Sequence, residues 1–131
     1  MSMTRIAAGV AAALLMSALA HAQPRCEASA AGREKLDVAC SLPEPATGKR
    51  YRFTAHFSGS HDDTRLSMVV TLEGAPLACE PGSKTDLTGE DGDVSLQCIV
   101  PAAAQVVTTR ALQVRLAWWH ALYTHFELSA E

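Results

Sequence analysis

The chain lacks the motifs on which most enzymes depend. It contains no G-x-S-x-G elbow, no H-E-x-x-H zinc motif, no P-loop and no dinucleotide-binding fingerprint. It also lacks an excess of basic residues: 11 stand against 14 acidic ones, and the net charge of -3 disfavours nucleic acid as a partner. We therefore expect a protein that is not an enzyme, that binds no nucleic acid and that holds no cofactor.

Long apolar runs are absent after the first 22 residues. Those residues contain Arg5, an apolar stretch from Ile6 to Leu19 and the small residues Ala20-His21-Ala22, which is the order of a secretory signal peptide. The stretch is about 14 residues long, shorter than the roughly 20 that a membrane span needs. We expect a signal peptide at 1–22, a single domain at 23–131, no membrane span and a periplasmic or secreted location.

All four cysteines follow the predicted signal peptide, and none stands in a C-x-x-C pair. An even number of cysteines in an oxidising compartment predicts two disulfides, with three connectivities open. We expect Cys26 to pair with Cys40, because this tie fastens the N-terminal arm to the first strand. We expect Cys79 to pair with Cys98, because Pro81-Gly82 favours a type II turn that moves the chain to a second sheet.

Apolar residues recur at every second position in most of the chain, which is the period of a half-buried β-strand. Turn residues separate these segments. The pattern predicts an all-β fold, an antiparallel Ig-like β-sandwich or flattened barrel of about seven or eight strands stapled by two disulfides. The alternating segments are 36–42, 51–57, 66–72, 94–100 and 112–118, with further apolar residues at 122, 126 and 128.

Two turns carry specific expectations. Asp91-Gly92 predicts a two-residue hairpin that places Leu87 opposite Leu96. Residues 119–121 contain no Gly, Pro or Asn, so either a turn near His120-Ala121 or a bulge interrupts the last apolar segment. We favour the turn.

The segment from Ser58 to Thr64 is the first candidate binding site, because binding residues sit on loops that a rigid scaffold holds. Its candidate residues are Ser58, Ser60, His61, Asp62 and Asp63. Ser58-Gly59-Ser60 resembles the loop that periplasmic lysozyme inhibitors, which are small disulfide-bearing β-proteins, insert into their target. The resemblance implies an inhibitor as one alternative function, and a solvated loop is the structural alternative.

The histidines suggest a second alternative. His61, Asp62 and Asp63 would form a zinc or copper site if the fold brought His56, His120 or His125 close to them. Their spacing in the sequence matches no known metal motif, so we predict no specific metal ligands.

The aromatic residues concentrate near the C-terminus, and two of them form the last candidate site. Trp118 continues the core alternation, so we expect Trp119 and Tyr123 on the opposite, outward face. Such a surface stacks on a sugar or anchors a protein partner, unless another part of the fold covers it.

Together these features predict a small, non-catalytic binding or accessory protein that contacts a protein partner in the cell envelope through residues 58–64. A periplasmic zinc- or copper-handling protein is the main alternative, and a lysozyme-inhibitor-like protein is another.

The signal and the even cysteine count predict that the secreted protein begins at Gln23 and contains no free thiol. Intact mass spectrometry of the secreted protein, with thiol titration after denaturation, measures both properties. A mass that includes residues 1–22, or thiols that titrate, would contradict the prediction.

Overall fold

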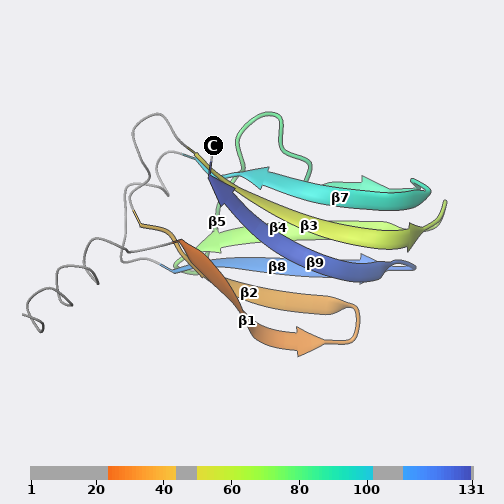
Figure 1. The fold of residues 1–131 in the computed structure, drawn as a ribbon, viewed down its shortest axis with the longest axis horizontal. Coiled ribbons are helices and arrows are strands. Elements are labelled where there is room, and N and C mark those ends of the chain that lie inside the picture. The colour runs from red at the N-terminus through yellow and green to blue at the C-terminus, as the bar shows by residue number, and fades with distance from the viewer. Residues whose placement is uncertain (1–23, 44–49, 102–110, 131) are drawn as a thin grey trace, which may run out of the picture.

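The computed structural model describes residues 24–43, 50–101 and 111–130 (Figure 1). These ranges contain β-strands and no helix, which confirms the all-β prediction. The predicted signal peptide lies outside them, and within them no helix has the length and hydropathy to cross a membrane. The strands are β1 (Arg25–Gly32), β2 (Lys35–Ser41), β3 (Tyr51–Ser60), β4 (Arg65–Leu72), β5 (Ala75–Pro76), β6 (Asp86–Thr88), β7 (Gly92–Ile99), β8 (Ala111–Trp119) and β9 (Leu122–Ala130).

The strands form two antiparallel sheets. Sheet A has six strands in the order β1-β2-β8-β4-β5, with β6 also paired to β4, and sheet B has the order β7-β3-β9. None of the nine described strands pairs with strands of both sheets, so the fold is a sandwich and not a flattened barrel. The count exceeds the expected seven or eight because β5 and β6, of two and three residues, are too short to show an alternating pattern.

The core lies between the sheets and uses the predicted alternating positions. On β3, Phe53, Ala55 and Phe57 are at most 1% exposed, and on β7 Leu96 and Cys98 are fully buried. The inward residues of β2, β4 and β8 complete the same cluster. Burial of these side chains supplies the main driving force for folding, roughly 1.5 to 3 kcal/mol for each large apolar residue.

Both predicted disulfides are present, and no described cysteine is free. Cys26 and Cys40 lie opposite each other on β1 and β2, with their Cα atoms 4.1 Å apart. Cys79 follows β5 and reaches Cys98 on β7, with a Cα separation of 5.3 Å. The first disulfide fastens the edge strand β1 to β2. The second disulfide links sheet B to the segment that follows β5 of sheet A.

The turn at Pro81-Gly82 also agrees with the prediction. The Ser83 N–H donates to the Glu80 carbonyl at 3.2 Å, and Gly82 has a φ of 94°, as the third residue of a type II turn requires. Lys84 then bridges to Gln97 of β7 before the chain returns to sheet A as β6. The turn therefore lies where the chain leaves one sheet to contact the other.

The predicted hairpin at Asp91-Gly92 is wrong. Leu87 lies opposite Leu66 of β4 and not opposite Leu96, because β6 belongs to sheet A and β7 to sheet B. Both Leu87 and Leu96 are buried, at 4% and 0% exposure, on opposite sides of the core. Apolar matching alone does not distinguish residues that pair along a sheet from residues that pack across the core.

The chain does turn at His120-Ala121, as we favoured, and the turn joins the two sheets. β8 pairs with β2 and β4 of sheet A, whereas β9 pairs with β3 of sheet B. His120 has a φ of 54°, a left-handed conformation that a bend this sharp requires.

A β-bulge at Thr124 changes which residues of β9 face the core. His125 and Tyr123 lie opposite consecutive residues of β3, so Thr124 has no partner of its own. The extra residue reverses the inward–outward alternation. Tyr123 therefore turns toward the core, and Leu122, which the sequence pattern placed inside, is 68% exposed.

Three connections between the sheets meet at one end of the sandwich, on the right in Figure 1, and we call it the crossover end. Thr64 joins them and is completely buried. Its Oγ1 accepts a hydrogen bond from the His61 N–H at 2.8 Å and donates to the His120 carbonyl, while its own carbonyl accepts from the Gly89 N–H at 3.1 Å. The connections are residues 61–64, 89–91 and 120–121.

We predict that Thr64→Val lowers the free energy of unfolding by about 1 to 3 kcal/mol, because it keeps the side-chain volume and removes both hydroxyl hydrogen bonds. Urea denaturation measures the change. Thr88→Val, at an exposed threonine of β6, is the matched control and should stay within about 0.5 kcal/mol of the wild type. Equal effects of the two substitutions would show that Thr64 does not hold the crossover end together.

Candidate functional site

The predicted binding loop is shorter than the sequence suggested. Ser58, Gly59 and Ser60 belong to β3, so only residues 61–64 form the connection. Ser60 is 2% exposed and its hydroxyl donates to the Glu90 carbonyl, so this side chain is occupied inside the protein. The Ser-Gly-Ser segment therefore forms the end of a strand, with Ser58 opposite Leu122 and Ser60 opposite Gly92.

His61, Asp62 and Asp63 are exposed. Of the three, Asp63 contacts His120 through its carboxylate. Its Oδ2 lies 2.5 Å from Nδ1 of His120. The His120 ring in turn stacks on Trp119, with a centroid separation of 4.5 Å and an interplanar angle of 16°. The loop thus contacts an exposed indole through His120, which is one of the three histidines that the sequence pattern offered as neighbours of this loop.

Trp119 lies on the outer face of sheet A, the face that points away from sheet B. This residue is 51% exposed and borders an open groove of about 450 Å³. Arg65 of β4 stands opposite Trp119, and Ser67 stands opposite Ala117. The outward residues of β6, Asp86 and Thr88, form the far wall.

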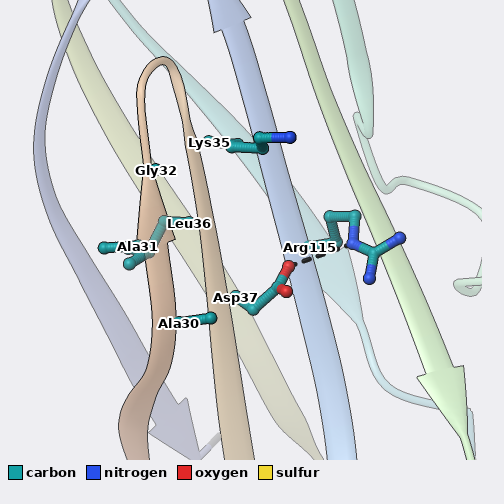
Figure 2. A pocket seen from close by; sticks show the side chains of 7 residues that line it. All are labelled: Ala30, Ala31, Gly32, Lys35, Leu36, Asp37 and Arg115. Carbon is teal, nitrogen blue, oxygen red and sulfur yellow. Dashed lines mark hydrogen bonds and ion pairs between the residues drawn. The ribbon is translucent and has the colours of Figure 1, made fainter.

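A second groove, of about 380 Å³, opens at the β1–β2 side of sheet A (Figure 2). Figure 2 shows Ala30, Asp37 and Arg115 side by side across β1, β2 and β8, with an ion pair of 3.0 Å between Arg115 Nε and Asp37 Oδ1. Small residues of β1 line one side of this groove. Arg115 and Ala117 are neighbouring outward residues of β8, so the two grooves adjoin on one face.

Tyr123 does not share a face with Trp119, so that prediction is wrong. Tyr123 stacks on Trp118 at 5.4 Å and meets Phe57 edge-on at 6.0 Å, inside the sandwich. The bulge at Thr124 is the reason, because it reverses the alternation on which the prediction depended. Burial raises the pKa of the Tyr123 hydroxyl.

A different cluster lies on the outer face of sheet B. His56 on β3 and His125 on β9 are register partners, and their rings stack at 4.1 Å. Glu127 lies two residues beyond His125 and has Oε1 within 3.1 Å of Nε2 of both histidines. The hydrogen bond with His125 holds the pKa of the Glu127 carboxyl below its usual value. The sequence analysis named both histidines and missed Glu127, although its spacing from His125 places it on the same strand face.

No protein-family model, curated protein or solved structure matches this chain.

We predict that the two tryptophans differ sharply in solvent access. Trp118→Phe leaves only the exposed Trp119, which should emit at longer wavelength and be quenched strongly by acrylamide. Trp119→Phe leaves only Trp118, which packs on Phe57 and Tyr123 and should be protected. Steady-state fluorescence of the two variants is the measurement, and similar quenching in both would show that the arrangement of β8 is wrong.

Proposed function

We propose that this chain is a non-catalytic binding protein of the cell envelope, periplasmic or secreted, which docks a folded protein partner on the outer face of sheet A. The observation that carries the proposal is the exposed, oriented indole of Trp119. Two disulfides are typical of proteins from such compartments. Tryptophan is among the residues that most often dominate binding energy at protein interfaces.

The shape of the face favours a protein over a small molecule. Sites for small ligands enclose most of the ligand surface, whereas both grooves here are open to solvent. The four long strands of sheet A have seven to nine residues, and at about 4.8 Å spacing and about 25 Å length they give on the order of 500 Å². A standard protein interface buries about 800 Å² on each partner, which this face and its rim approach.

The chemistry of the face agrees with a protein partner. Every described residue that points outward from β2, β4, β6 and β8 is at least partly exposed, and Val69, at 47% exposure, adds an apolar contact beside Arg115. The Arg115–Asp37 pair neutralises the centre of the face. Asp63 and His120 restrict the indole before binding, which reduces the entropy that a partner must overcome.

We predict that a photocrosslinking amino acid at Ala117, beside the groove, captures one discrete protein in the cells that naturally produce this chain. The same amino acid at Ser129, an exposed residue on the opposite face of the sandwich, is the matched control and should capture none. Trp119→Ala should remove the Ala117 adduct and leave the free energy of unfolding within about 1 kcal/mol of wild type, as for exposed positions.

Three outcomes would overturn the proposal. One is an adduct at Ala117 that persists in Trp119→Ala. Another is an adduct with the mass of two copies of this chain, which would indicate self-association. The last is the absence of any protein adduct together with Trp119-dependent retention on peptidoglycan or chitin, which would indicate that the indole stacks on a sugar.

A further inference from the structure

We propose that His56, His125 and Glu127 form a binding site for a late first-row divalent ion, Zn²⁺ or Cu²⁺, on the outer face of sheet B. Among the described residues this is the group of three His, Cys, Asp or Glu side chains whose ligand atoms converge, all within 4.8 Å of one another. It lies on the other face of the sandwich from the proposed docking surface. The proposal is therefore independent of the protein-binding function.

The donor atoms have the identity and the spacing that such an ion requires. Imidazole nitrogen and carboxylate oxygen both bind zinc at about 2.0 to 2.2 Å, so two ligands of a tetrahedral ion lie about 3.3 Å apart. Glu127 Oε1 lies 3.0 Å from His56 Nε2 and 3.1 Å from His125 Nε2. Imidazole ligands also favour copper over harder ions such as Mg²⁺ or Ca²⁺.

A neighbouring hydroxyl directs the lone pair of His125 toward the site. Thr124 Oγ1 donates its single proton to the His56 carbonyl at 2.9 Å. The same oxygen lies 3.2 Å from Nδ1 of His125 and accepts from an Nδ1–H when Nε2 binds an ion. The ion then replaces the present hydrogen bond between Nε2 of His125 and Oε1 of Glu127. Hydrogen bonds of this kind orient histidine ligands in metal proteins.

His56 gives a second, independent indication. Its Nε2 atom is shielded from solvent and has no hydrogen-bond partner, although it lies 3.0 Å from the Glu127 carboxylate. The contact therefore lacks hydrogen-bond alignment. Coordination to an ion would give this shielded nitrogen an aligned partner.

The site is suited to exchange. Three protein ligands leave a fourth tetrahedral position open, as in zinc sites that bind an exchangeable molecule and unlike closed structural sites. The stacked rings must rotate so that both lone pairs converge on one ion. Their side chains are 35% and 57% exposed and border an open groove of about 330 Å³, so space for this rotation exists.

Calorimetric titration of the secreted, tag-free protein with ZnSO₄ and with CuSO₄ tests the proposal. We expect one equivalent to bind, with Cu²⁺ bound more tightly than Zn²⁺. His125→Ala should weaken binding by about 100-fold or more, because losing a direct ligand exceeds the 10- to 100-fold cost of losing an outer-shell partner. Glu127→Gln should weaken it about tenfold or more, since the substitution keeps the shape and removes the charge.

His61→Ala is the matched control, because it removes an exposed histidine from the crossover end and leaves the cluster intact. We expect unchanged affinity in this variant. Electron paramagnetic resonance of the Cu²⁺ complex should show two coordinated imidazole nitrogens in the wild type and one in His125→Ala. Absence of stoichiometric binding, or binding that His61→Ala removes and His125→Ala retains, would overturn the proposal. Circular dichroism of each variant verifies that the sandwich is folded.

Discussion

The hydrogen bonds of Thr64 fix the end of the sandwich on which the candidate docking site depends. Three separate segments change sheets there, and each exposes backbone groups that no strand partner satisfies. One buried threonine supplies partners to all three, through its hydroxyl and its carbonyl. The neighbouring Asp63 then reaches His120, and through its ring sets the indole of Trp119. The need of buried backbone N–H and C=O groups for hydrogen-bond partners thereby helps to set the position of the exposed Trp119 side chain.

The bulge at Thr124 determines which side chains of β9 face the core and which face solvent. Without it, Tyr123 and His125 would point to the same side of sheet B, as the sequence alternation suggests. With it, Tyr123 packs against Phe57 and Trp118, while His125 joins His56 and Glu127 on the outside. The same residue that creates the bulge then uses its hydroxyl to orient His125. Bulges are frequent at sheet edges and near functional sites because they redirect side chains in this manner.

Features that depend on a single segment could be predicted from the sequence. The period of two in 51–57 and 94–100 locates β3 and β7, and Pro81-Gly82 locates a type II turn. Features that depend on which segments meet could not. Leu87 and Leu96 satisfy an apolar pairing rule while packing across the core from different sheets. His56 and His125 become neighbours only through the register of β3 with β9, which no local pattern encodes. The position of Tyr123 depends on one extra residue, Thr124, which shifts the alternation between residues 122–123 and residues 125–128.

The proposed ion site also bears on the stability of the sandwich. β9 pairs only with β3 among the described strands, so one edge of sheet B depends on a single ladder and on core packing. His56 belongs to β3, whereas His125 and Glu127 belong to β9, so a bound ion joins the two strands across their outer face. An ion that binds only the folded state stabilises it by about 2.7 kcal/mol at a free concentration 100 times its dissociation constant. Metal binding and retention of β9 are therefore linked.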